Sequence, residues 1–199
     1  MASPLLCGVP VQLSLFDVGG PMPTVADVEG LLLAGGALVR RSEVARISVV
    51  VDAGWRAAAL AEALAERGVG GDLGESIGGQ RSVRSDFSAR LLDIARRWTV
   101  GARIRVPEPW TLDPGRLRMW AIAGGWLDPA GFVLRVGAND DQLWDAAGSA
   151  LSAAGVAGVF LGVRAGGPGY RVVGGKRLTR LREMLGDPPA GCPTGRWPS

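Results

Sequence analysis

Leu31-Leu32-Leu33-Ala34-Gly35-Gly36 is an apolar stretch that ends in a small Ala-Gly-Gly step, and the same step returns at Ala123-Gly124-Gly125. A glycine inside a helix costs roughly 1 kcal/mol relative to alanine, so a pair of glycines is tolerated where another backbone must come close. We therefore expect two helices that pack on each other at a helix seam. Its predicted residues are Ala34, Gly35, Gly36, Ala123, Gly124 and Gly125.

The order of segments is the same after each step. In the first half, a helix from Thr24 to about residues 37–39 precedes a strand at 44–52, a helix at 55–67, strands at 72–77 and 80–86, and a helix at 87–98. In the second half, the predicted elements are a helix at 116–126, a strand at 131–137, a helix at 140–154, strands at 158–165 and 169–173, and a helix at 176–185. This periodicity predicts an internal repeat of mixed helices and strands.

Individual residues also match between the halves. An offset of 87 residues aligns Gly68-Val69 with Gly155-Val156, and Arg84 with Arg171. We predict an α+β fold of two αββαββα halves, residues 24–99 and 116–187, about a pseudo-twofold axis. Residues 100–115 are the predicted linker, and residues 1–23 and 188–199 are predicted Pro/Gly-rich tails, with Trp197 solvated in the second tail.

The composition limits the chemistry. The 199 residues include no histidine, which removes the commonest general base and the commonest zinc ligand. Cys7 and Cys192 both lie in predicted tails, so we expect no metal, cofactor or structural disulfide. The net charge of +3 suits a polyanionic partner, although ordinary solubility charge explains it equally well. No apolar run reaches the roughly 18 residues that span a membrane, so we expect a cytoplasmic protein without membrane contact.

The first tail contains a short candidate binding peptide, Gln12-Leu13-Ser14-Leu15-Phe16. By alternation, the same residues could form an edge strand with Val11. The pentapeptide also resembles the motif by which many bacterial replication and repair proteins bind the DNA sliding clamp. In that interpretation Leu15 and Phe16 fill an apolar pocket, Leu13 adds contact area and Gln12 forms a hydrogen bond at the rim, while Ser14 completes the matched pattern. Five matching positions favour the clamp interpretation.

The repeat and its glycine-containing helices resemble the LAGLIDADG fold of homing endonucleases. In that family the two Leu-Ala-Gly helices pack through their glycines, and each half supplies a sheet that curves over DNA. The sequence Leu33-Ala34-Gly35-Gly36 resembles the Leu-Ala-Gly-Gly-like step in the halves of the N-terminal domain of WhiA-type bacterial regulators. The resemblance covers about residues 24–187 and implies a monomer with an internal pseudo-dimer.

The sequence departs from the nucleases where their chemistry occurs. Those enzymes end each central helix with an acidic residue, and the acid pair holds a divalent metal. Here Gly36 is followed by Ala37 and then by Arg40 and Arg41, while only Asp128 follows the second step. Because Asp128 precedes a proline, it is equally suited to a turn. We therefore expect no catalytic residues and no metal site.

Arginines in the predicted strands are the candidate DNA contacts. They alternate with apolar neighbours and would reach phosphates and guanine edges, although the solvent face of a strand is normally charged. The candidates are Arg46, Arg84, Arg135, Arg164 and Arg171.

Together these features predict a non-catalytic accessory protein of bacterial DNA replication or repair, which binds the sliding clamp (the DNA polymerase III beta subunit) and double-stranded DNA. One alternative is a WhiA-like DNA-binding transcriptional regulator, although no residues for a helix-turn-helix remain after Leu185. The other is a LAGLIDADG endonuclease with acids supplied from elsewhere.

Overall fold

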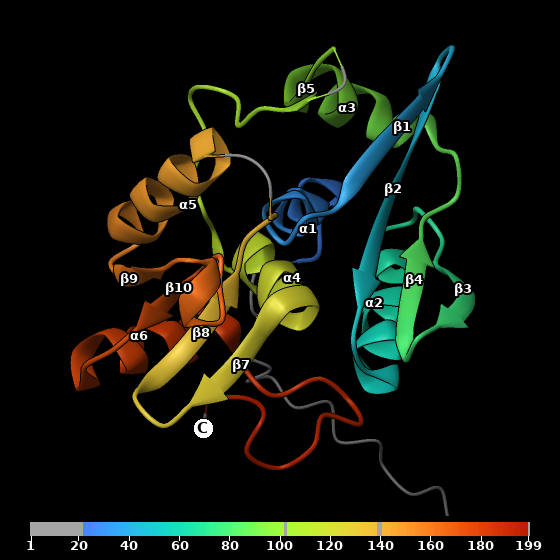
Figure 1. Cartoon of the computed structure of the whole chain (residues 1–199). Helices are drawn as coiled ribbons and strands as arrows, with labels where there is room; N and C mark the ends of the chain where they lie inside the picture. Colours follow the sequence, from blue (N-terminus) through green and yellow to red (C-terminus); the bar gives the residue numbers. More distant parts are fainter. Residues whose placement is uncertain (1–21, 102, 139–140, 199) are drawn as a thin grey trace, which may run out of the picture.

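Two central helices organise the molecule. The computed structural model describes residues 22–101, 103–138 and 141–198, except for the side chains of residues 75–77. Helices α1 (Glu29–Leu33) and α4 (Pro114–Gly124) lie at the centre, with strands of the two halves on either side (Figure 1). Residues 12–16, on which the clamp prediction depends, lie outside the described residues.

The main elements follow the same order in both halves. After a 3-10 turn at Val25–Val28 and α1, the first half contains β1 (Ala37–Arg41), β2 (Val44–Val51), α2 (Gly54–Glu66), β3 (Asp72–Ile77), β4 (Gln80–Arg84) and α3 (Leu92–Trp98). The segment between the halves contains β5 (Thr99–Val100) and β6 (Arg103–Ile104). After α4, the second half contains β7 (Gly125–Asp128), β8 (Gly131–Arg135), α5 (Asp141–Ala153), β9 (Gly158–Leu161), β10 (Gly169–Val172) and α6 (Gly175–Leu185). No helix in this described part of the chain could cross a bilayer.

Each half forms one four-stranded antiparallel sheet. The strand order is β1-β2-β4-β3 in the first half and β7-β8-β10-β9 in the second. The inner faces of the sheets join the central helices in one apolar core, in which Trp98, Trp120 and Phe132 are fully buried. The predicted α+β fold is therefore confirmed, and both halves have the same sheet topology.

The central helices come closest at Gly30, one turn before the predicted seam. A Cβ on Gly30 would lie 2.8 Å from the carbonyl carbon of Arg116 and 3.1 Å from the backbone nitrogen of Trp120. Only a residue without a side chain allows α1 to pass this close to α4. The two Ala-Gly-Gly steps also meet, but less tightly, since a Cβ on Gly124 would lie 3.7 Å from Cβ of Ala34.

Both central helices end earlier than predicted. Helix α1 ends at Leu33 because Gly35 adopts a left-handed conformation (φ 89°) and the N–H of Gly36 donates to Leu31 O at 2.8 Å. The prediction of a helix to residues 37–39 was thus wrong, since Ala37–Arg41 is strand β1. Likewise α4 ends at Gly124, because Gly125 is extended and pairs with Leu134.

Residues 187–198 form a strap that passes close to Trp55 of α2 and returns to Phe132 of β8; we call it the C-terminal strap. Trp197 is buried, packs edge-to-face on Phe132 with ring centroids 6.3 Å apart, and donates from Nε1 to Gly186 O at 2.9 Å. Arg118 of α4 lies over the Trp197 ring and donates to Asp187 O at 2.7 Å. The prediction of a solvated Trp197 was therefore wrong.

Candidate nucleic-acid interface

The outward face of the first sheet carries two of the predicted arginines. Along β2, Ile47 and Val49 are buried, whereas Arg46 and Ser48 alternate with them and point to the other face. Arg84 of β4 pairs directly with Ser48 across the sheet, so its side chain lies on the same outward face. The structure thus brings Arg46 and Arg84 together on one surface.

This surface is basic but not uniformly so. Arg41 and Arg46 both lie over the ring of Phe87, with Cζ 4.8 and 4.5 Å from its centroid. Such cation–π contacts hold the guanidinium groups in place while leaving their donors available. Val50, on the same face of β2 as Arg46, is 58% exposed, and Asp72 is paired with Arg84 in the β3–β4 register. The face combines oriented cations with apolar patches.

The second sheet presents Arg135 and Arg171 on its outward face. Arg171 pairs with Val133 across β8–β10, opposite the buried Phe132 and Leu134. Arg135 is exposed at the end of β8, with Cζ 5.5 Å from the centroid of Trp126 on the neighbouring strand β7. Arg135 is therefore available to a ligand.

Arg171 is bonded to Asp128, the single acid that follows the second helix. Its Nη2 donates to Asp128 Oδ2 at 2.7 Å, while Oδ1 accepts the backbone N–H of Ala130 at 2.7 Å. Asp128 is therefore a turn residue and the partner of an arginine, as the Asp-Pro sequence allowed. The pair also reduces the positive charge that Arg171 offers to DNA.

Arg164 does not lie in a strand, so this part of the prediction was wrong. Strand β9 ends at Leu161, and residues Val163–Ala165 form a 3-10 turn that ends at Gly166 in the left-handed conformation (φ 86°). Arg164 is exposed on this turn, away from the alternating face that includes Arg171.

Arg56 occupies the C-terminal end of α4. This side chain from the first turn of α2 is 5% exposed and donates from Nη1 to Ile122 O at 2.7 Å and to Ala121 O at 3.3 Å. Its Nη2 donates to Gly125 O, and its Nε pairs with Asp52 at 3.1 Å. Burial lowers the pKa of Arg56, whereas the carboxylate of Asp52 raises it.

A cation at this position suits the electrostatics of the helix end. The last carbonyl groups of a helix carry a partial negative charge and lack partners within the helix. Here the carbonyls are bound by a guanidinium, whose charge would repel a divalent ion. Among the described residues, no group of three or more His, Cys, Asp and Glu side chains could hold a metal.

A buried carboxylate links the two halves near the start of α1. Glu29 is 0% exposed and accepts from Arg97 Nη2 at 2.8 Å, Trp110 Nε1 at 2.7 Å and Arg116 Nε at 2.8 Å. These donors come from α3, the segment between the halves, and α4. The Glu29 carboxylate thus accepts three hydrogen bonds, which stabilise the packing of the two halves.

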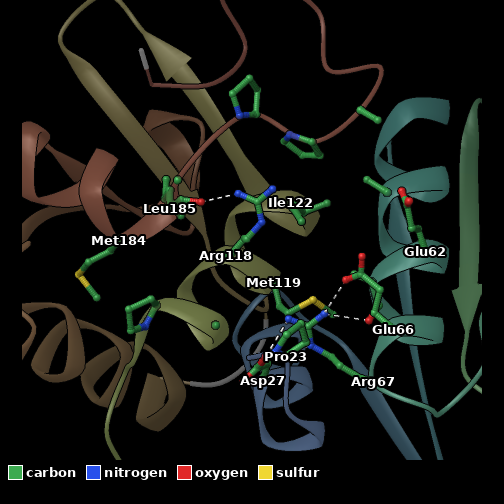
Figure 2. Close-up of a pocket in the computed structure, with 18 of the residues that line it drawn as sticks. Pro23, Asp27, Glu62, Glu66, Arg67, Arg118, Met119, Ile122, Met184 and Leu185 are labelled. Carbon is green, nitrogen blue, oxygen red and sulfur yellow. Dashed lines mark hydrogen bonds and ion pairs between the residues drawn. The ribbon is translucent and has the colours of Figure 1, made fainter. Parts of the chain in front are cut away.

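A cavity of about 510 Å³ lies beside the N-terminal part of α4, between α2 and α6 (Figure 2). Its charged groups are mostly used in structural bonds: Arg67 bonds the buried Asp27 at 2.8 Å and lies 3.6 Å from Glu66. Arg118 donates to the backbone at Leu185, as Figure 2 shows. The outward sheet faces, with freer arginines, are the stronger candidate for a polyanion.

The structural positions of three residues, Arg56, Glu29 and Arg196, were not predicted from the sequence. Arg56 stands at the start of an Ala/Leu helix, where a cation opposes the helix dipole, and that misfit was a usable signal. Glu29 stands within an apolar segment, another position that requires a partner. Arg196 lines a cavity beside Arg56 and Arg135 because the C-terminal strap folds back, and no local pattern in the sequence indicates that position.

The chain has a LAGLIDADG-like fold. It is similar to the crystal structure of the N-terminal LAGLIDADG domain of DUF199/WhiA, with a TM-score of 0.56 and 12% identity over 87% of this chain and 86% of that chain. It also aligns with a double mutant of I-SmaMI, with a TM-score of 0.44 and 15% identity over 80% of this chain and 83% of that chain. No protein-family model matches the sequence, and no curated protein matches it.

Proposed function

We propose that this protein is a non-catalytic DNA-binding protein, whose two outward sheet faces contact the backbone of double-stranded DNA. The observation that carries the proposal is the strand register, which sets Arg46 and Arg84 on one outward face and Arg135 on the other. Arginines on a curved sheet would neutralise phosphates, and such contacts supply most of the affinity of non-specific DNA binding.

The test is the salt dependence of DNA binding. Arg46→Ala with Arg84→Ala should weaken binding of a fluorescent duplex about tenfold or more and lower the salt slope by about 2, since each phosphate contact contributes about 0.9. Arg177→Ala with Arg182→Ala removes the same charge from exposed positions on α6 and should leave both quantities unchanged. Equal losses in the two variants would indicate only a net-charge effect.

The proposal of a non-catalytic protein rests on Arg56. Its guanidinium binds the α4 carbonyls where a metal-assisted phosphodiester cut would need an acid and a cation. We expect the purified protein to leave supercoiled plasmid intact with Mg²⁺ or Mn²⁺. Metal-dependent nicking that disappears in Asp128→Asn would contradict this and support the endonuclease alternative.

We further propose that the peptide Gln12–Phe16 binds the DNA sliding clamp, a proposal supported by its five-position sequence match. Weak clamp binding and weak DNA binding on one molecule would reinforce each other where clamp and DNA meet. Leu15→Ala with Phe16→Ala should abolish clamp capture and leave the circular dichroism spectrum unchanged. Leu5→Ala with Leu6→Ala, in the same tail, is the matched control.

A transcriptional regulator without clamp contact is the second candidate, and the similarity to the WhiA domain favours it. A regulator of this kind should also bind duplex DNA in a salt-dependent way, but it should not bind the sliding clamp. A titration of residues 1–23 against purified clamp separates the two, because the regulator would give no saturable binding.

A further inference from the structure

A second, smaller cavity lies where the C-terminal end of α4 meets the first half. Its volume is about 200 Å³, and it is lined by Asp52, Arg56, Ala123, Gly124, Trp126, Arg135 and Arg196. Binding pockets for drug-sized molecules typically measure ~300–1,000 Å³, so this cavity suits a smaller group. The lining comes from the β2–α2 connection, α2, α4, the second sheet and the C-terminal strap.

The charge around this cavity is unbalanced. Three guanidinium groups face it with one carboxylate, Asp52, which pairs with Arg56 Nε at 3.1 Å. The other donors of Arg56 bond the backbone of α4, whereas Arg135 and Arg196 are both exposed. Burial is the main cause that lowers the pKa of Arg56, and the like charges of Arg135 and Arg196 lower it further. An anion in the cavity would relieve this repulsion.

We propose that this cavity binds a single phosphate group, with Arg135 and Arg196 as its direct ligands and the Arg56 guanidinium as fixed positive charge behind it. Guanidinium groups match phosphate oxygens in paired hydrogen bonds, and the cavity is too small for a nucleoside. Where the phosphate belongs to a DNA backbone, the inference rests on the proposed function. A free phosphate would use the same ligands.

The two ligands are positioned by packed and hydrogen-bonded neighbours. Arg135 lies over the Trp126 ring, and its carbonyl accepts the indole N–H of the buried Trp120. Arg196 precedes Trp197, whose burial on Phe132 fixes the end of the strap. The C-terminal strap therefore has a role beyond closing the core, because it delivers one of the phosphate ligands.

The experiment follows the indole N–H resonance of Trp126 in ¹⁵N-labelled full-length protein, assigned with Trp126→Phe. Inorganic phosphate and a duplex DNA are titrated separately into three proteins: wild type, Arg135→Ala with Arg196→Ala, and the control Arg177→Ala with Arg182→Ala. We expect phosphate to shift the resonance in wild type and control, and not in the cavity variant. For DNA, the cavity variant should bind about fivefold more weakly, with the salt slope lowered by about 0.9.

The outcomes separate this inference from the proposed function. A phosphate shift without any DNA binding would support the cavity site and overturn the DNA proposal. A phosphate shift with unchanged DNA affinity in the cavity variant would support a site for free phosphate. If phosphate leaves the Trp126 resonance unmoved, and the cavity variant binds DNA as the control does, the phosphate site and the DNA contact of Arg135 are both overturned, while DNA binding through Arg46 and Arg84 stands.

Discussion

Arg56→Met tests whether a buried guanidinium stabilises the end of α4. Methionine retains most of the aliphatic volume and removes every donor, so the change isolates the hydrogen bonds. Arg56 donates to Ile122 O at 2.7 Å and to Ala121 O at 3.3 Å, both in α4, and to Gly125 O at the start of β7. A hydrogen bond from a charged group contributes roughly 1.5–3 kcal/mol, and a buried carbonyl left unpaired is costly.

The expected net loss is smaller than the sum of these bonds. Removing the guanidinium also removes its desolvation cost, which is the main cause of its lowered pKa. The ion pair adds little, because the Asp52 side chain is 56% exposed and such surface pairs contribute ~0–1 kcal/mol. We therefore expect Arg56→Met to lower the free energy of unfolding by about 3 kcal/mol.

Urea unfolding followed by tryptophan fluorescence measures this loss, provided that the m-value is unchanged. Asp52→Asn is the matched control, with an expected loss below about 1 kcal/mol. The reasoning is refuted if Arg56→Met unfolds at the wild-type urea concentration, or if Asp52→Asn is equally damaging. The second result would assign the stabilisation to the ion pair rather than to the helix end.

Three further predictions test the packing and the titration of single groups. Gly30→Ala should cost about 3 kcal/mol because backbone atoms of α4 obstruct the new methyl group, whereas Gly124→Ala should cost less than about 1 kcal/mol, as compared by urea unfolding. Gly148→Ala should lower the melting temperature despite better helix propensity, because the new Cβ would collide first with the hydroxyl oxygen of Tyr170, and the loss should shrink in a Tyr170→Phe background, which lacks that oxygen. The thiol of Cys192 should alkylate with a pH midpoint above that of the urea-unfolded protein, because burial raises its pKa; equal midpoints, measured on the Cys192 peptide by mass spectrometry, would contradict this.

The order of elements could be predicted because it depends on local periodicity. Residues 44–52 alternate between apolar and polar side chains, and β2 follows that alternation with Arg46 outward and Ile47 buried. The repeated steps predicted two central helices, and α1 and α4 do pack on each other, but the glycine at their tight contact is Gly30 rather than one in either Ala-Gly-Gly step.

The boundaries could not be predicted, because they depend on single backbone conformations. Nothing in the composition of residues 34–39 distinguishes one more helical turn from a cap and a strand. The left-handed Gly35 decides it, and the pairing of Ala37 with Ser48 then stabilises the strand. Similarly, the position of closest helix contact at Gly30 depends on how α4 crosses α1.

The candidate phosphate site could not be predicted from the sequence for a different reason. Arg56, Arg135 and Arg196 are separated along the chain by whole elements, and the folded-back strap, held at Asp187 by Arg118 and at its end by the buried Trp197, brings the last of them to the cavity. Only Arg135 was predicted, from strand alternation. Long-range convergence of this kind leaves no periodic pattern in the sequence.

The three hydrogen bonds that Glu29 accepts determine what happens when the chain is cut into two fragments. Arg97 belongs to the first half, Arg116 to the second, and Trp110 to the segment between them. A chain cut between residues 100 and 105 would give two fragments, one with a buried carboxylate short of two donors and the other with the donors alone. Such fragments regain the full bond set only by reassociating. The protein therefore offers a place for a split reporter, in which two fused partners are detected by the recovery of one fold.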